Sequence, residues 1–173
     1  MKTSELRPID YSNLKILVVE DNQHMRTIVT TILTGAGVNS YSIREARDGA
    51  EALETLRQFP ADMALVDYNM SPIDGIEFVK LLRNASDSAN KYLPIIMVTG
   101  HTEKSRVMEA RDAGINEFVV KPLTANSLMS RIFSLVMRPR SFVRCSSYFG
   151  PDRRRRETPN YSGPFRRSSD GMT

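Results

Sequence analysis

The sequence predicts an α/β fold, in which one open, doubly wound, parallel sheet of five strands carries helices on both faces. Short, continuous apolar runs at residues 16–19, 63–66 and 95–98 are typical of strands that are buried on both sides. Amphipathic helical patterns separate these runs. Five strand-helix units within about 125 residues predict one open, parallel, doubly wound sheet.

The remaining elements are read from weaker signals. Residues 118–120 form a shorter apolar run, and residues 40–43 predict a further weak strand. A first helix is expected where apolar residues recur at helical spacing, at Met25, Ile28, Val29, Ile32 and Leu33. Gly35 and Gly37 suit the C-terminal end of this helix. Three more helical patterns cover residues 50–56, 76–82 and 107–110, and a last helix follows Thr124.

Composition limits the kind of protein this is. The 173 residues are 40% hydrophobic and 25% charged, which suffices for one ordinary core. No run of about 18 apolar residues predicts a membrane span, and the first 15 residues lack the apolar stretch of a signal peptide. The lone Cys145 fits a reducing compartment, and two histidines with one cysteine do not make a zinc cluster. We therefore expect a cytoplasmic protein.

Charged and polar residues follow the predicted strands where the strands end. Glu20 and Asp21 follow the first, Asp67 the third, Thr99 the fourth and Lys121 the fifth. Because ligands of such sheets bind at the carboxyl ends of the strands, these five side chains are expected to converge there.

This combination of groups predicts phosphoryl chemistry. Three neighbouring carboxylates raise one another's pKa, and a hard cation such as Mg²⁺ relieves their repulsion. An ionised Asp67 beside the metal can attack a phosphoryl group, whose oxygens Lys121 would help to neutralise. Thr99 could then donate a hydrogen bond to the bound phosphoryl group.

Four segments resemble the receiver domain of bacterial two-component response regulators, which has the chemotaxis CheY fold: ILVVEDNQHMR, MALVDYNMSPIDG, IIMVTGHTE and FVVKPL. The resemblance covers residues 12–137 and leaves residues 1–11 as an N-terminal extension. It implies the CheY/flavodoxin-like strand order 2-1-3-4-5 and a histidine kinase or phosphotransfer protein as phosphodonor.

The resemblance also implies a role for each residue of the pocket. Asp67 matches the phosphoacceptor, and Glu20 and Asp21 match the acidic pair at the metal. Asn69 would offer its backbone carbonyl to Mg²⁺. Thr99 and Lys121 match the pair that senses the phosphoryl group, and Phe118 stands at the position of the switch aromatic.

Residues 138–173 differ in composition from the rest of the chain. They contain nine arginines and three carboxylates, a net charge of +6, whereas the preceding residues carry a net charge of −2. Helical periodicity stops, and Pro, Gly, Ser and Arg replace it. We expect this arginine-rich tail to have no core of its own and to stay disordered until it binds a ligand.

The tail repeats the phrase Y-x-G-P-x-R-R at a spacing of 13 residues, with Gly-Pro expected to form a turn before each arginine pair. Arginine can form bidentate hydrogen bonds to phosphate oxygens or to the edge of guanine, and aromatic rings stack on bases. Two similar half-sites suit a ligand with two similar guanylate halves, such as cyclic di-GMP. The candidate ligand-binding residues are Tyr148, Arg153, Arg154, Arg155, Arg156, Tyr161, Arg166 and Arg167.

A CheY-like domain followed by YFGPDRRRR…PFRR resembles the Cle proteins, cyclic di-GMP effectors of alphaproteobacteria. That resemblance implies a non-enzymatic signalling protein whose bound state acts on a partner such as the flagellar motor switch, and so on motility and surface attachment. Two alternatives remain open. The tail could bind nucleic acid or anionic membrane, or the chain could be a chemotaxis-type regulator that uses the receiver alone.

Overall fold

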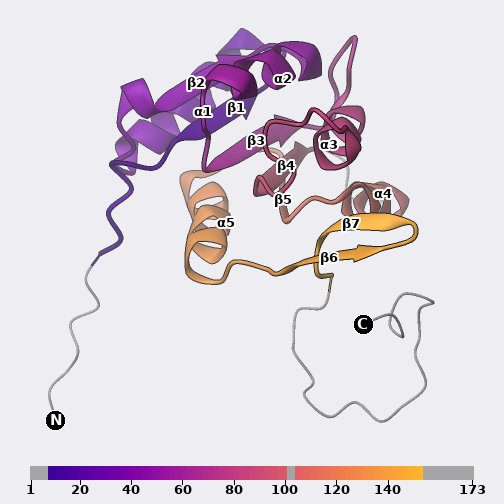
Figure 1. Cartoon of the computed structure of the whole chain (residues 1–173). Helices are drawn as coiled ribbons and strands as arrows, with labels where there is room; N and C mark the ends of the chain where they lie inside the picture. Colours follow the sequence, from indigo (N-terminus) through magenta and orange to yellow (C-terminus); the bar gives the residue numbers. More distant parts are fainter. Residues whose placement is uncertain (1–7, 101–103, 154–173) are drawn as a thin grey trace, which may run out of the picture.

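The computed structural model describes residues 8–100 and 104–153 (Figure 1). Its main sheet has five parallel strands in the order β2-β1-β3-β4-β5, which confirms the predicted fold class and strand order. The strands are β1 (Ile16–Val19), β2 (Ile43–Ala46), β3 (Met63–Asp67), β4 (Ile95–Thr99) and β5 (Glu117–Val120). In parallel register, Val66 of β3 lies opposite Val19 of β1 and Met97 of β4.

Helices cover both faces of this sheet and are α1 (Gln23–Gly35), α2 (Gly49–Gln58), α3 (Gly75–Asn84), α4 (Lys104–Ala113) and α5 (Ala125–Met137). Leu33 of α1 and Ile132 of α5 are fully buried on one face, against Ile16 and Ile96. On the other face Leu56 of α2 and Phe78 of α3 pack with a second set of strand residues. Alternate residues of the strands supply the two cores, as a doubly wound sheet requires. Among the described helices none is both long and apolar enough to cross a bilayer.

The helices begin where the sequence provides caps. Asn22 caps α1, Asp48 caps α2 and Asp74 caps α3, each by accepting a hydrogen bond from a backbone N–H in the first turn. Thr124 caps α5, so the helix begins directly after it, as predicted.

The weak strand expected at residues 40–43 is placed differently. Ser40–Ser42 form a short 3₁₀ helix, and β2 begins only at Ile43. Strand β2 lies at the edge of the sheet, so the side chains of Arg44 and Glu45 are exposed and the apolar run is interrupted. This interruption is why the strand signal was weak.

The first part of the predicted tail is not a coreless segment. Strands β6 (Phe142–Cys145) and β7 (Tyr148–Pro151) form an antiparallel hairpin that packs against α3 and α4 (Figure 1). Gly150 and Pro151, which were expected to form a turn, instead belong to β7. Residues 154–173 lie outside the described part of the chain. Tyr11, expected in an extension, packs against the core together with Leu14.

Aromatic side chains hold this hairpin on the domain. The rings of Phe142 and Phe149 lie 5.2 and 5.3 Å from that of Tyr92, which precedes β4. Phe149 is buried, so the hairpin has a small apolar core of its own. The prediction missed this core because its third ring comes from a loop 50 residues earlier in the chain.

Two glycines allow the hairpin backbone to approach the end of α4. Gly114, which follows α4, has φ +110°, and a Cβ there would lie 3.1 Å from the carbonyl oxygen of Phe149. A Cβ on Gly150 would lie 3.0 Å from the Cα of Gly114 and closer still to the hydroxyl of Tyr148. A larger residue at either position would force the hairpin away from α4.

Below the hairpin lies the buried guanidinium group of Arg83. This fully buried side chain of α3 donates hydrogen bonds to the backbone oxygens of Gly114, Lys91 and Leu93. Its guanidinium carbon lies 4.9 Å from the ring centre of Phe142. Burial lowers the pKa of Arg83 to about 10, which still leaves it charged at neutral pH. Arg83 therefore connects α3 with the segments that precede β4 and β5 and with the hairpin.

Candidate functional site

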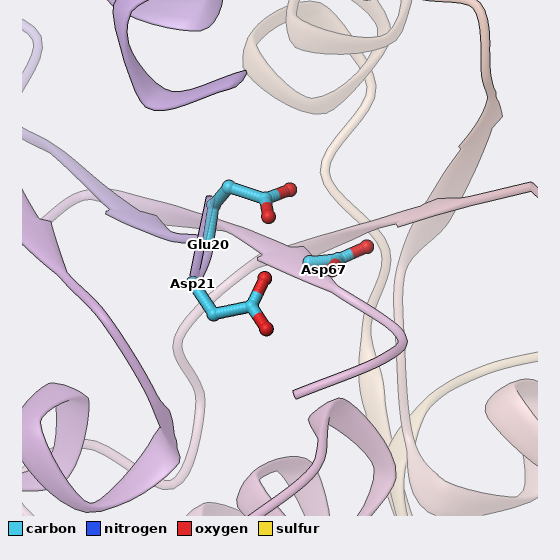
Figure 2. Close-up of side chains that lie close together, drawn as sticks. All are labelled: Glu20, Asp21 and Asp67. Atoms are coloured by element: carbon cyan, nitrogen blue, oxygen red, sulfur yellow. The ribbon is translucent and has the colours of Figure 1, made fainter. Parts of the chain in front are cut away.

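The predicted acidic residues converge at the carboxyl ends of β1 and β3. One carboxylate oxygen from each of Glu20, Asp21 and Asp67 lies within 4.8 Å of the other two, and the three side chains face a common space (Figure 2). Glu20 and Asp67 are only 5% and 4% exposed, whereas Asp21 is exposed. Parallel strand ends bring together residues that are 46 positions apart in sequence.

Lys121 extends from the end of β5 into the same space. Its Nζ lies 3.0 Å from Oδ1 of Asp67 and 3.4 Å from Oε2 of Glu20. The Lys121 backbone N–H also donates to the carbonyl oxygen of Thr99, which fixes the start of the loop that carries this lysine. The ammonium group is thus already in contact with the candidate phosphoacceptor.

Burial dominates the electrostatics of the pocket. The pKa of Glu20 is raised to about 7, mainly by burial, and the charge of Asp67 contributes to this rise. Burial also raises the pKa of Asp67, although hydrogen bonding to Lys121 opposes this rise. For Lys121, burial acts to lower the pKa, but the hydrogen bond and charge of Asp67 outweigh it, so that the net shift is upward.

These residues fit a hard divalent cation. Three carboxylates, two of them buried, and one ammonium group leave an excess of negative charge at this site. The donor set is composed of oxygen atoms, with open solvent beside Asp21 for bound waters, which is the environment that Mg²⁺ prefers. Glu20, Asp21 and Asp67 would hold such an ion.

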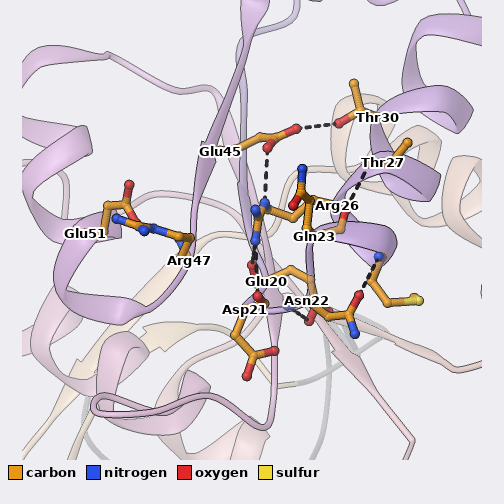
Figure 3. Close-up of polar contacts among 11 residues, drawn as sticks. Glu20, Asp21, Asn22, Gln23, Arg26, Thr27, Thr30, Glu45, Arg47 and Glu51 are labelled. Atoms are coloured by element: carbon orange, nitrogen blue, oxygen red, sulfur yellow. Dashed lines mark hydrogen bonds and ion pairs between the residues drawn. The ribbon is translucent and has the colours of Figure 1, made fainter.

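The loop that carries Glu20 and Asp21 is held by an arginine that sequence analysis did not select. Arg26 of α1 donates from Nη1 to the backbone oxygens of Glu20, at 2.8 Å, and Asp21, at 3.2 Å (Figure 3). Its Nε pairs with Glu45 of β2 at 3.1 Å. The backbone N–H of Asn22 donates to Oε1 of Glu20. Arg26 is a positioning residue for the acidic pair.

The other predicted pocket residues occupy the surrounding elements. Asn69 lies two residues after β3, and its backbone N–H donates to the carboxylate of Asp67. Thr99 is buried at the end of β4, beside β3. Phe118 is half-buried on β5, and it lines a small cavity below α4 that Thr99 and Tyr68 also line.

The family model described as the response regulator receiver domain matches residues 16–133. The chain belongs to the response regulator receiver domain family. It is 38% identical over 120 residues to the chemotaxis protein CheY-3 of Vibrio cholerae, covering 69% of this chain and 89% of that protein. It is 37% identical to the chemotaxis protein CheY of Pseudomonas aeruginosa, covering 69% of this chain and 93% of that protein.

Solved structures agree with this assignment. The crystallised CheY4 of Vibrio cholerae aligns with a TM-score of 0.63 at 32% identity, covering 69% of this chain and 96% of that one. A response regulator from Chloroflexus aurantiacus aligns with a TM-score of 0.65 at 28% identity, covering 72% of this chain and 98% of that one. The receiver accounts for most of the chain, and the match to the family model ends at residue 133.

Sequence analysis also missed a polar connection from the pocket to α4. The hydroxyl of Tyr68, which directly follows Asp67, donates to Oε2 of Glu109 at 2.7 Å. The guanidinium carbon of Arg106 lies 5.5 Å from the centre of the Tyr68 ring. The sequence places Tyr68 next to the candidate phosphoacceptor, which could have marked it as a pocket residue. Its partners Arg106 and Glu109 could not be recognised, because they lie on α4, 38 and 41 residues later.

Two of the predicted tail residues are within the described structure, and they contact each other. The guanidinium carbon of Arg153 lies 4.0 Å from the centre of the Tyr148 ring, and its Nη1 pairs with Asp112 of α4 at 2.8 Å. The Tyr148 hydroxyl donates to the carbonyl oxygen of Pro151. The other predicted ligand residues are outside the described part of the chain: Arg154, Arg155, Arg156, Tyr161, Arg166 and Arg167.

Proposed function

We propose that this receiver is a non-enzymatic signalling protein that accepts a phosphoryl group on Asp67 and binds cyclic di-GMP through its arginine-rich C-terminal segment. The bound state changes the surface that the receiver presents to a partner such as the flagellar motor switch. Its relatives are named chemotaxis proteins, which supports a role in signalling of the chemotaxis type. Such a protein acts in the cytoplasm, at the motor or at the cell pole.

The pocket geometry supports the phosphoryl transfer. An ionised oxygen of Asp67 attacks the phosphorus of a phosphohistidine on a kinase or phosphotransfer protein, and the bond from phosphorus to the donor nitrogen breaks. Lys121, 3.0 Å from Asp67, neutralises charge on the transferred group. Mg²⁺, when bound by the three carboxylates and the Asn69 carbonyl, supplies further positive charge there. Thr99 then donates to the phosphoryl group, and Phe118 moves in response.

The observation that carries the nucleotide proposal is the contact between Arg153 and Tyr148. Arg153 is the first residue of the run of four arginines, and the hairpin holds it on an aromatic ring beside α4. The run therefore starts from a fixed point on the receiver. Planar guanidinium groups next to aromatic rings suit a ligand that offers both phosphate oxygens and guanine bases.

Isothermal titration of the full chain tests this proposal. We expect saturable binding of cyclic di-GMP and much weaker binding of GMP, which offers only one half of the ligand. Replacing Arg153 to Arg156 by alanine should abolish the binding, whereas alanine at the exposed Arg57 of α2 should leave it unchanged. Unchanged affinity after the fourfold replacement would contradict the proposal.

The excess of positive charge after residue 137 favours one competing function, in which the segment binds nucleic acid or anionic membrane. Replacing every arginine after residue 137 by lysine separates the two, because lysine keeps the charge but loses the forked geometry. Cyclic di-GMP binding should be lost in this variant. Binding that survives the exchange and falls steeply with salt would favour the competing function.

A further inference from the structure

Five arginines lie over aromatic rings in the part of the chain that the structure describes. Four of them also make a hydrogen bond or an ion pair, and these are Arg44, Arg83, Arg106 and Arg153. Arg144 of β6 is the fifth, and its guanidinium carbon lies 4.2 Å from the centre of the Phe149 ring. Among the described residues no acceptor is hydrogen-bonded to Arg144 and no carboxylate pairs with it, so its N–H groups are available to a ligand.

The surroundings of Arg144 form a small, flat surface on the hairpin. Arg144 lies opposite Phe149 in the register of β6 and β7, and Phe149 is buried whereas Arg144 is exposed. The side of the guanidinium group that faces away from Phe149 is therefore accessible. Tyr92, which is 60% exposed, packs its ring against the same Phe149 ring at 5.3 Å. An accessible cation and an exposed aromatic ring thus border one buried ring.

This surface suits a planar base better than a simple anion. A guanidinium group stacks on the face of a base, and a neighbouring tyrosine ring adds aromatic contact. A stacked guanidinium group keeps its N–H groups at its edge, where they can donate to phosphate oxygens or to the O6 and N7 atoms of guanine. A free phosphate would use the N–H groups of Arg144 but neither its accessible face nor the ring of Tyr92.

We propose that Arg144 and Tyr92 form a base-binding site, in which one guanine of cyclic di-GMP stacks on the guanidinium group. The inference rests on the proposed function, since it identifies where on the hairpin one half of that ligand is held. Neither residue belongs to the Y-x-G-P-x-R-R repeats. Phe149, opposite Arg144, is four residues before Arg153, a stretch that spans at most about 14 Å. One dinucleotide can therefore contact Arg144 and the arginine run that begins at Arg153.

Titration of cyclic di-GMP into variants of the full chain tests this site. Arg144→Lys keeps the charge but loses the planar group, and Arg144→Met can still cover the Phe149 ring. We expect each to weaken binding roughly tenfold, because each removes the surface on which the base stacks. A role limited to covering Phe149 predicts instead that Arg144→Met binds normally.

The matched control for these variants is Arg44→Met. Arg44 also lies over a ring, that of Phe59, but it is on β2 at the edge of the sheet opposite β5, and its Nη1 donates to the backbone oxygen of Tyr41. This variant should bind cyclic di-GMP like the unaltered chain. Thermal unfolding of all three variants shows whether the fold is retained.

Nuclear magnetic resonance of the isotope-labelled full chain gives a readout that needs no substitution. With cyclic di-GMP bound, nuclear Overhauser cross-peaks should connect the H8 proton of guanine with side-chain protons of Arg144 and with ring protons of Tyr92. No such cross-peaks should reach Arg44 or Phe59. Cross-peaks from H8 that reach other residues and neither Arg144 nor Tyr92 would place the base elsewhere and overturn the site.

The outcomes separate this inference from the proposed function. If the unaltered chain does not bind cyclic di-GMP, the proposed function fails and the base-binding site fails with it. If the unaltered chain binds, and replacing Arg153 to Arg156 by alanine abolishes the binding, the proposed function stands. Unchanged affinity of Arg144→Lys and Arg144→Met would then overturn the base-binding site alone.

Discussion

The acidic pocket and the hairpin are two polar regions on one receiver, and they are built in opposite ways. The pocket takes its residues from strand ends, where sheet topology brings Glu20, Asp67 and Lys121 together and buries the two carboxylates. The hairpin lies outside the sheet and is held by ring contacts, by the Arg83 side chain below it and by the Arg153–Asp112 pair. The pocket is part of the core, whereas the hairpin is attached to it.

This difference indicates how each region can respond to a ligand. Moving a pocket residue means moving a buried strand, so the pocket is preorganised for its chemistry. The hairpin rests on few buried side chains and is therefore expected to open at lower free energy than the sheet. A preorganised candidate phosphorylation site and a more easily displaced hairpin are suited to two separate inputs.

The largest effect is expected from removing the phosphoacceptor. Asp67→Asn keeps the shape of the side chain but loses the nucleophilic oxygen, so phosphorylation by a small-molecule phosphodonor should disappear completely. Mass spectrometry of the intact chain would detect the added phosphoryl group. Asp87→Asn, which alters an exposed carboxylate paired with Arg57, should be phosphorylated normally. Phosphorylation that persists in Asp67→Asn would show that another residue is the acceptor.

Removing the buried ring of the hairpin should destabilise the hairpin and leave the sheet with the acidic pocket unchanged. Phe149→Ala deletes a side chain whose loss in a core costs about 3–5 kcal/mol, and here the hairpin alone is expected to detach. Hydrogen exchange should then become roughly a hundredfold faster at the amides of β6 and β7, with β1 to β5 unchanged. Phe133→Ala, at an exposed ring of α5, is the control.

If the sheet amides lose protection together with those of the hairpin in Phe149→Ala, the hairpin is an integral part of the core. The contrast between an embedded pocket and an attached hairpin would then be wrong.

Proton binding in the pocket should oppose binding of Mg²⁺. The pKa of Glu20 is raised from 4.5 to about 7 in the folded state, so protonated Glu20 favours folding below pH 4.5, and this contribution is lost as the pH rises through 7. Mg²⁺ needs the ionised form, so its affinity should be roughly tenfold weaker at pH 6 than at pH 8.

Calorimetric titration of Mg²⁺ at both pH values checks this expectation. In Glu20→Gln the affinity should be lower, and its dependence on pH over the same range should be smaller. An affinity of the unaltered chain that is constant between pH 6 and 8 would remove Glu20 from the site.

The smallest effect concerns the ion pair between the hairpin and α4. Asp112→Ala removes the partner of Arg153, but the Asp112 side chain is 56% exposed, so solvent screening limits the cost to about 1 kcal/mol or less. Chemical denaturation of this variant beside Asp87→Ala would measure the difference. A cost of several kcal/mol would mean that the pair, rather than the aromatic cluster, holds the hairpin.

How far the sequence predicts the structure also differs between the two regions. Continuous apolar runs located four of the five sheet strands, and the order of residues at their ends placed Asp21, Asp67 and Lys121 correctly in one pocket. Those inferences need only local patterns and the geometry of parallel sheets.

The hairpin could not be predicted in this way, because its stability comes from contacts distant in sequence. Phe142 and Phe149 depend on Tyr92, and Gly150 depends on Gly114. The local composition of residues 138–153, rich in Arg, Ser and Pro, is typical of segments without a core. Tyr68 was missed for the same reason, since its partner Glu109 lies on another helix. Arg26 was missed although the backbone oxygens that it binds are only five and six residues earlier, because no sequence pattern shows where its side chain donates.

The central claim is that the C-terminal arginine segment makes this receiver a cyclic di-GMP effector. The most direct test compares cyclic di-GMP titrations of the full chain and of a chain that ends at Arg153, which keeps the sheet, the hairpin and the acidic pocket. We predict saturable binding by the full chain and at least a hundredfold weaker binding by the shortened one. Equal affinity in both, or no binding by the full chain, would contradict the claim.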